Sequence, residues 1–222
     1  FPDVLALASR KHNLYCSIGI HPHNVEDEPE FRTEEVVKKI DANEKVIGVG
    51  ETGLDYFYEN SPRGLQRASF VTHIDVARKT GLPIIIHSRE ADEDTIQILR
   101  EESKKGHFPG LIHCFTGGSN LAKTALDCGL SISLSGIITF KNAAELRAVA
   151  RDIPVDRLLL ETDSPFLAPT PCRGKRNEPS FLRHTADFVA KMLEIDIKFL
   201  ETQTTGNFHK LFTRVGIAEK RS

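Results

Sequence analysis

The sequence has little methionine, no long apolar run and no leader pattern. Its 222 residues include one methionine, Met192, and they begin at Phe1. We therefore interpret Phe1 as an internal position of a longer protein and not as the start of translation. No stretch approaches the ~18 consecutive apolar residues that a membrane-spanning helix needs, and the amino terminus lacks a signal-peptide pattern. The sequence thus gives no reason to expect a membrane partner.

Cysteine spacing, glycine fingerprints and excess positive charge are absent as well. The four cysteines show no Cys-x-x-Cys spacing, which argues against a zinc site made of thiolates. It favours reduced thiols in a cytoplasmic protein, while leaving room for one disulfide pair. Neither G-x-G-x-x-G nor G-x-x-x-x-G-K-[ST] occurs, so a dinucleotide cofactor is not expected. Because 29 Lys and Arg stand against 31 Asp and Glu, a nucleic-acid partner would have to meet a local site.

Short apolar runs alternate with longer amphipathic stretches, and no linker, repeat or low-complexity segment interrupts them. This order predicts one α/β domain over residues 1–222. The predicted strands are Leu14–Ile20, Val46–Gly50, Pro83–His87, Leu111–Phe115, Leu130–Leu134 and Leu158–Leu160. The predicted helices run from Ser61-Pro62 to Gly81, from Ser119 to Gly129, over Asn142–Arg151 and over Phe181–Met192, with Ser180, Asp196 and Asn207 as candidate caps.

Some of the predicted strands are apolar on both faces, which is typical of a parallel sheet that is covered on both sides. An open doubly wound sheet and a closed (β/α)8 barrel share this pattern. The barrel needs eight strands and ~250 residues, whereas the sequence indicates six strands. Two further strands before Phe1 would supply the difference and would add about 45–50 residues.

Polar side chains follow five of the apolar runs where each run ends. They are His21 and His23, then Glu51 and Asp55, then His87 and Arg89, then His113, then Glu161 and Asp163. Because the carboxyl ends of parallel strands meet at one face, these residues are expected to converge there. Imidazole and carboxylate groups on several strand ends make a rigid site for a divalent ion.

Each of these residues has a structural alternative when it is taken alone. His87 could be a hydrogen-bonded structural histidine, and Glu51 and Asp163 could cap the helices that follow them. Asp55 and Glu161 could orient a ligand or form an ion pair. The functional interpretation rests on the coincidence of five strand ends, since the strand bodies carry almost no charge.

A basic loop follows the last predicted strand. It runs from Pro169 to Pro179 and carries three cations within four residues, Arg173, Lys175 and Arg176. A solvated surface loop is the structural alternative. Because the loop comes soon after Asp163, we expect the three cations to face an anionic substrate.

These motifs together resemble the TatD family of metal-dependent DNases, in the amidohydrolase superfamily. The resemblance covers nearly the whole chain from Gly19 onward. Its motifs are Gly19-Ile20-His21-Pro22-His23, Gly50-Glu51-Thr52-Gly53-Leu54-Asp55, Ile86-His87-Ser88-Arg89, His113-Cys114-Phe115-Thr116-Gly117, Leu160-Glu161-Thr162-Asp163-Ser164-Pro165 and the loop Pro171–Pro179.

The resemblance implies a (β/α)8 TIM barrel with one or two divalent metal ions, Mg²⁺, Mn²⁺ or Zn²⁺, at the strand ends. It places the bridging carboxylate on Glu51, two histidine ligands on His87 and His113, and an aspartate ligand on Asp163. Glu51 and Asp163 are also the expected catalytic residues. The family's first strand ends in a His-x-His pair. The resemblance assigns His21-Pro22-His23 to a different motif, near the substrate, so the pair has no counterpart here. We therefore expect the first two strands to be missing from this chain.

The resemblance also implies the reaction and the substrate. We expect metal-activated water to cleave phosphodiester bonds of DNA, and of RNA as a second substrate, in the manner of an exonuclease. His21, His23, Arg89 and the three cations of the basic loop are the expected substrate-binding residues. Two alternatives stay open: a hydrolase of a lactone or an aminoacyl-tRNA ester, or an inactive fragment with an open barrel.

Overall fold

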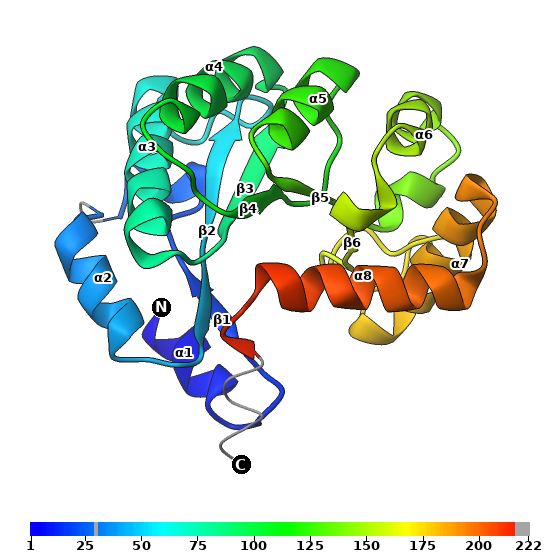
Figure 1. The fold of residues 1–222 in the computed structure, drawn as a ribbon, viewed down its shortest axis with the longest axis horizontal. Helices are drawn as coiled ribbons and strands as arrows, with labels where there is room; N and C mark the ends of the chain where they lie inside the picture. Colours follow the sequence, from blue (N-terminus) through cyan, green and yellow to red (C-terminus); the bar gives the residue numbers. More distant parts are fainter. Residues whose placement is uncertain (29–30, 216–222) are drawn as a thin grey trace. The chain divides into compact units, whose positions relative to one another are not determined.

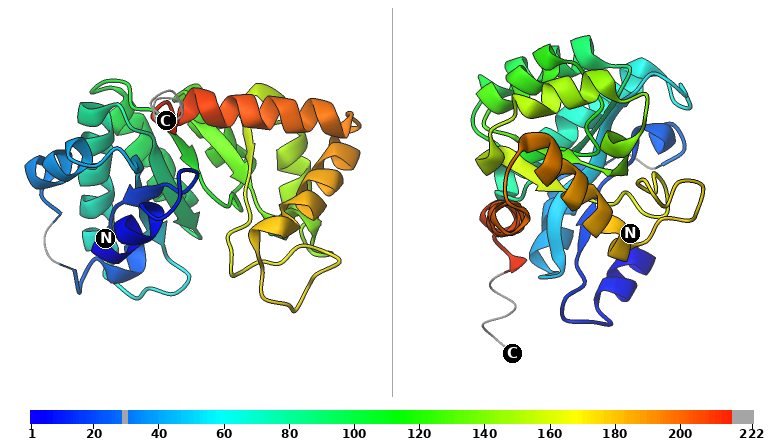
Figure 2. Two further views of the ribbon diagram at one scale, coloured as in Figure 1. Left: turned by 90° about the horizontal axis from the view of Figure 1, so that it is seen from below. Right: turned by 90° about the vertical axis from the view of Figure 1, so that its right-hand side faces the viewer.

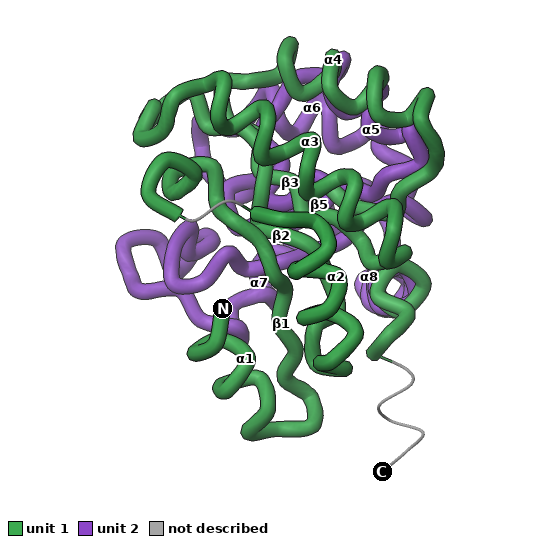
Figure 3. The backbone as a smooth tube through the Cα atoms, turned by 90° about the vertical axis from the view of Figure 1, so that its left-hand side faces the viewer, with its two compact units in different colours: residues 1–111, 209–222 green, residues 112–208 purple. Residues whose placement is uncertain are grey.

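The chain forms two compact units in the computed structural model, which describes residues 1–28 and 31–215. Unit 1 comprises residues 1–111 and the carboxyl-terminal segment from His209, and unit 2 comprises residues 112–208 (Figure 3). The single domain expected over residues 1–222 stays a prediction.

The described residues contain six strands, whose order in the sheet follows the sequence from β1 to β6. The neighbours β1 and β2, β2 and β3, and β5 and β6 run parallel. The predicted α/β class is thus confirmed, while closure into an eight-stranded barrel stays a prediction. The strands are β1 Cys16–Ile18, β2 Val46–Asp55, β3 Ile84–Arg89, β4 Gly110–Ile112, β5 Ser131–Leu134 and β6 Leu158–Leu160.

Helices alternate with these strands along the chain (Figure 1). The α-helices are α1 Pro2–Ala8, α2 Thr33–Asp41, α3 Arg63–Thr80, α4 Asp92–Ser103, α5 Ser119–Asp127, α6 Ala144–Arg151, α7 Leu182–Leu193 and α8 Ile197–Leu211. The short 3₁₀ helices are η1 Pro22–Asn24, η2 Gly136–Thr139, η3 Val155–Arg157 and η4 Pro179–Phe181. No helix among the described residues is long and apolar enough to cross a membrane.

Strand β2 is the longest strand and supports the middle of unit 1. It continues five residues beyond the predicted end at Gly50, because Gly53 and Leu54 pair with residues of β3 in parallel register. Gly53 is required at this point. Its φ is +133°, and a Cβ atom there would lie 2.0 Å from the backbone oxygen of His87. The sequence predicted that the strand ends at Gly50, whereas Gly53 permits a close approach of two strands that continue.

Strand β3 presents two different faces. Ile84 and Ile86 are fully buried, whereas the alternate residues His87 and Arg89 are partly exposed. Because successive side chains of a strand point to opposite faces, His87 and Arg89 lie on the same side of the sheet. The apolar face of the strand therefore anchors the residues that carry the polar chemistry.

Helix α3 packs against β2 and follows the predicted boundaries closely. It ends at Gly81, whose φ of 69° gives the left-handed conformation expected of a terminating glycine. The prediction that Ser61 caps this helix is wrong. Its hydroxyl instead accepts from the backbone N–H of Glu26 and donates to the backbone oxygen of His23, so it supports the segment that carries His23.

Unit 2 is built on β5 and β6, with Ile132, Leu134 and Leu158 fully buried between strands and helices. Helix α7 leads by a short turn into α8 (Figure 2). Asp196 caps α8 as predicted, because its Oδ1 atom accepts from two backbone N–H groups of the first turn. Asn207 does not act as a cap. It lies inside α8 and donates to the backbone oxygens of Val155 in η3 and of Leu158 at the start of β6.

Candidate metal centre

Glu51 and His87 lie side by side at neighbouring strands of unit 1. The distance from His87 Nδ1 to Glu51 Oε1 is 2.9 Å. Glu51 sits within β2, where the register against β3 shifts between Gly50 and Thr52. Both side chains are partly exposed, so they are anchored by the strands and still accessible to a solute. The structure therefore brings together two of the four predicted metal ligands.

The segment after β1 brings two further imidazoles to the same place. His21 Nε2 lies 3.5 Å from Glu51 Oε1, and the rings of His21 and His87 are 4.9 Å apart. His21 also begins the helix η1, since its Nδ1 atom accepts the backbone N–H of His23. The sequence assigned His21 and His23 to the substrate. The geometry groups His21 with Glu51 and His87, whose ligand atoms all lie within 4.8 Å of one another.

Asp55 is the residue that the predicted ligand set left out. Its side chain is fully buried at the end of β2, and its Oδ2 atom lies 2.9 Å from His23 Nε2 and 2.9 Å from His87 Nε2. A carboxylate on the second ring nitrogen fixes the tautomer and orientation of a metal-binding histidine. Asp55 is thus placed to orient His87 toward Glu51. The sequence signal was present, because Asp55 belongs to the motif Gly50–Asp55.

The charge of Asp55 is balanced by its partners. Burial alone would raise its pKa, because a buried carboxylate is poorly solvated. The backbone N–H of Tyr58 and the rings of His23 and His87 form hydrogen bonds that outweigh burial, so the pKa of Asp55 lies below its ordinary value. The group is therefore an anion at neutral pH, which suits an acceptor for imidazole N–H groups.

Unit 2 holds a second polar cluster at the ends of β4 and β6. His113 Nδ1 lies 2.8 Å from Glu161 Oε1, and His113 Nε2 lies 3.9 Å from Asp163 Oδ1. The hydroxyl of Ser133, in the neighbouring strand β5, donates to Glu161 Oε2 at 2.8 Å. Glu161 thus stands to His113 as Asp55 stands to His87, as a carboxylate on one ring nitrogen.

The predicted ligands therefore fall into two groups, Glu51 with His87 in unit 1 and His113 with Asp163 in unit 2. That all four residues serve one centre stays a prediction.

The predicted phosphate-binding cations differ in their surroundings. The guanidinium of Arg89 lies over the rings of Phe57 and Tyr58, at 4.1 and 4.7 Å from their centroids. In unit 2, Arg173 lies 3.7 Å from the centroid of the Phe140 ring. Lys175 and Arg176, in the same loop, are exposed.

The donor set of unit 1 fits a divalent ion. It combines imidazole nitrogen and carboxylate oxygen, which suit Zn²⁺, Mn²⁺ and Mg²⁺ in that order of softness. Two ligands at ~2.1 Å from one ion are separated by about 3.0–3.4 Å when they are adjacent. The distances of 2.9 and 3.5 Å from Glu51 Oε1 to His87 and His21 match that separation.

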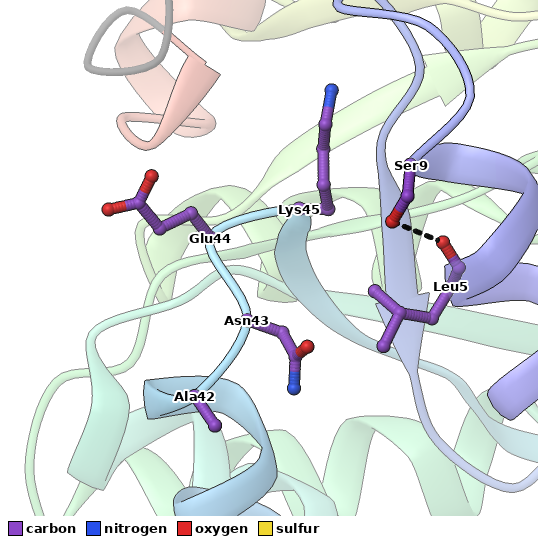
Figure 4. A pocket seen from close by; sticks show the side chains of 6 residues that line it. All are labelled: Leu5, Ser9, Ala42, Asn43, Glu44 and Lys45. Atoms are coloured by element: carbon purple, nitrogen blue, oxygen red, sulfur yellow. Dashed lines mark hydrogen bonds between the residues drawn. The ribbon is translucent and has the colours of Figure 1, made fainter. Parts of the chain in front are cut away.

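A hollow elsewhere in unit 1 shows no such donor set. It has a volume of about 320 Å³ and lies between α1 and the loop before β2 (Figure 4). The ammonium of Lys45 at its edge is bound by three backbone oxygens, and Ser9 donates to the backbone of Leu5. The hollow therefore belongs to the packing of α1, and the candidate chemistry lies at the strand ends.

Comparison with known proteins gives a consistent result. Residues 1–213 match the family model described as TatD related DNase. The chain is 46% identical over 217 residues to a metal-dependent hydrolase of Buchnera aphidicola, covering 96% of this chain and 82% of that protein. It is 37% identical over 221 residues to the 3′-5′ ssDNA/RNA exonuclease TatD of Erwinia amylovora, covering 95% and 83%.

A solved structure shows the same fold. The crystal structure of YjjV, a TatD homologue from Escherichia coli, superposes with a TM-score of 0.87 at 27% identity. The superposition covers 96% of this chain and 82% of that one. The arrangement of strands and helices is thus shared with a relative whose structure was determined by experiment.

Proposed function

Since this chain belongs to the TatD-related DNase family of metal-dependent hydrolases, we propose that it cleaves phosphodiester bonds of single-stranded DNA. RNA is a second substrate, and the direction is that of a 3′-5′ exonuclease, the activity named for the Erwinia relative. The observation that carries the proposal is the contact of Glu51 with both His87 and His21.

In the proposed centre, the carboxylate of Glu51 is the metal ligand that lies next to both imidazoles, His21 and His87. Glu51 is the acidic member of the group in unit 1, and its Oε1 atom faces both imidazoles. His113 and Asp163 are the proposed ligands from unit 2. When bound, a divalent ion supplies Lewis acidity, which lowers the pKa of a water molecule and offsets charge on the phosphate.

The protein's own residues then have separate tasks. Asp163 orients the attacking water and takes its proton, and Asp55 keeps His87 in the tautomer that faces Glu51. Arg89 and His23 bind the phosphate on the substrate side of the strands. Arg173, Lys175 and Arg176 attract the nucleic-acid backbone, because they concentrate positive charge in a chain whose net charge is −2.

A digestion assay tests this function. The substrate is a single-stranded oligonucleotide with a 5′ fluorescent label, incubated with the protein and saturating Mg²⁺ or Mn²⁺. The wild-type protein should give a ladder that shortens from the 3′ end, and chelation should stop it. Glu51→Gln should nearly abolish cleavage and keep the fold, because the amide removes the charge of the shared ligand.

Glu101→Gln is the matched control. It also replaces a glutamate by glutamine, and Glu101 is exposed on α4. It should digest the oligonucleotide as the wild-type protein does. Wild-type turnover in the Glu51→Gln protein would refute the proposed centre, and the absence of cleavage by the wild-type protein with every divalent ion would refute the proposed substrate.

A further inference from the structure

Two aromatic residues next to the candidate centre are exposed. Phe57 and Tyr58 follow Tyr56 in the loop after β2, and 50% and 53% of their surfaces are accessible. By contrast, Phe70, Phe108 and Phe115 are fully buried. Phe166 and Phe199 are exposed as well, so exposure alone does not distinguish the pair. Phe57 and Tyr58 differ in that the two exposed rings are adjacent and Tyr58 contacts a histidine of the candidate centre.

The rings have a fixed arrangement. Their centroids are 4.8 Å apart and their planes are nearly perpendicular. The planar guanidinium of Arg89 lies over both of them, which leaves its edges available to an anion. Tyr58 also meets the ring of His23 edge to face, at 5.3 Å between centroids. The aromatic pair is thus continuous with the histidines of the centre.

A single buried carboxylate connects the pair to the chemistry. Asp55 Oδ1 accepts the backbone N–H groups of Phe57 and Tyr58, at 3.1 and 3.0 Å. Its other oxygen faces His23 and His87. Because the carboxylate of Asp55 binds both the aromatic loop and the histidines, the rings of Phe57 and Tyr58 keep a defined distance from the candidate metal ligands.

The preceding tyrosine is used differently. The hydroxyl of Tyr56 donates to Asp94 at 2.5 Å, and Arg63 stacks on its ring. Burial, together with the bond to Asp94, raises the pKa of Tyr56 to about 12. Tyr56 is therefore part of the packing between the loop and α4. Of the three aromatic residues that follow β2, Phe57 and Tyr58 are the two that are exposed.

We infer that Phe57 and Tyr58 form a stacking platform for a nucleobase of single-stranded nucleic acid, with Arg89 between the platform and the substrate backbone. The inference rests on the proposed function and adds a base-binding site to it. Stacking suits a substrate of any sequence, because every base has a π-face. A guanidinium that is already stacked on two rings can bind a phosphate without losing its orientation.

A binding experiment with matched substrates tests the platform. One oligonucleotide is ten thymidines long, and the other has stable abasic residues in place of the three nucleotides at its 3′ end. Both are measured by fluorescence anisotropy without divalent metal, so that nothing is cleaved. The wild-type protein should bind the complete oligonucleotide about tenfold or more tightly, since stacking on an aromatic ring contributes roughly 1–3 kcal/mol per base.

Substitutions then assign the preference to the two rings. Phe57→Ala and Tyr58→Ala should each remove most of the difference between the two oligonucleotides, and Tyr58→Phe should restore it, because the ring is kept. Phe199→Ala is the control, since Phe199 is a phenylalanine of similar exposure, 52%, on α8. If Phe57→Ala fails to fold, Phe57→Leu serves in its place, because leucine keeps apolar contact and lacks the π-face.

An equal preference in the wild-type and alanine proteins would overturn the platform, as would equal wild-type affinity for both oligonucleotides. The result is independent of cleavage. A protein that shows the preference and hydrolyses neither oligonucleotide with metal would refute the proposed function and leave the base-binding site standing.

Discussion

At the scale of single residues, Asp55 shows how one side chain organises its surroundings. It is fully buried, and each of its oxygens contacts two groups. One oxygen faces the imidazoles and the other holds the aromatic loop. A buried carboxylate is costly unless it is paired, so all four groups contribute to its stability. This explains why the histidines and the exposed rings have defined positions.

His73 is a second buried polar residue, and it binds the backbone of the segment that carries His21 and His23. Its Nε2 atom accepts the backbone N–H of Ile20, directly before His21, and its Nδ1 atom lies 2.7 Å from the backbone oxygen of Ser69. The ring of Phe31 stacks on it at 3.7 Å. These contacts require the neutral imidazole, because Nε2 must stay without a proton to accept from Ile20.

The buried state of His73 predicts a dependence of stability on pH. Burial lowers the pKa of His73 to about 4, against 6.5 for the unfolded chain. Between these two values the unfolded state binds more protons, so stability rises with pH in this window and is reduced toward pH 4. Between pH 7.5 and 4.5 the wild-type protein should lose about 2–3 kcal/mol from this group.

Urea unfolding at the two pH values measures the effect. His73→Gln should lose less stability than the wild-type protein on going from pH 7.5 to 4.5, because the amide does not titrate in this range. His107→Gln is the control at an exposed histidine and should keep the wild-type difference. A His73→Gln protein with an unchanged difference would show that His73 is not the buried, neutral group described here.

At the scale of elements, helix α3 serves as the scaffold for the polar segments of unit 1. Gln66 and His73 lie seven residues apart on its buried face. Gln66 accepts the backbone N–H of Asp55 at 2.8 Å, and its amide donates to the backbone oxygens of Asp55 and Ser61. One helix face therefore holds both the end of β2 and the segment before His21.

Removing the Gln66 amide should destabilise the protein. In Gln66→Leu, the backbone N–H of Asp55 and two carbonyl oxygens would be buried without these partners, at roughly 1–3 kcal/mol for each group left unsatisfied. Gln97→Leu makes the same change on the exposed face of α4 and should stay within about 0.5 kcal/mol of the wild-type protein. Thermal unfolding compares the two, and equal stability of the two variants would contradict the role of Gln66.

The elements also show what the sequence could and could not predict. All six apolar runs became strands, and Gly81 ended α3 as expected, because periodicity and terminal glycines act locally. The last five residues of β2 were not predictable. Gly53 permits a close approach to β3, and this contact between strands has no signal in the local sequence. Ser61 and Asn207 resemble caps in sequence but bind distant backbone groups, and such tertiary partners leave no local pattern.

At the scale of the whole molecule, the net charge of −2 makes the location of positive charge important. The loop that carries Arg173, Lys175 and Arg176 is exposed, and Arg173 stacks on Phe140. We expect this loop to supply affinity for nucleic acid and to leave the chemical step unchanged. The reason is that the loop would stabilise the bound substrate and the transition state by the same free energy.

Salt titration of oligonucleotide binding tests the loop. Replacing all three cations by glutamine should lower the slope of log Kd against log salt by roughly 0.7 for each phosphate contact that is lost. KM should rise more than kcat falls. The control replaces three exposed lysines of unit 2, Lys123, Lys191 and Lys198, and should keep the wild-type slope. Equal slopes and equal KM in the loop variant would show that the loop is only solvated.

The contact between Glu51 and His87 was predictable, because both residues stand at the ends of neighbouring predicted strands. That His113 and Asp163 join them in one centre stays a prediction. That His21 would join Glu51 and His87, and that Asp55 would orient the ring of His87, depends on side-chain geometry. Sequence spacing brings residues to one edge of a sheet, but it does not decide which nitrogen meets which oxygen.

Anomalous X-ray scattering can show whether Glu51 and His87 bind a divalent ion, as proposed for the catalytic centre. Crystals of the protein grown with Mn²⁺ or Zn²⁺ would be measured at the absorption edge of the metal. We expect a peak within roughly 2.3 Å of a Glu51 carboxylate oxygen and a His87 ring nitrogen, with His113 bound to the same ion. An ion bound elsewhere, with neither imidazole within that distance, would contradict it.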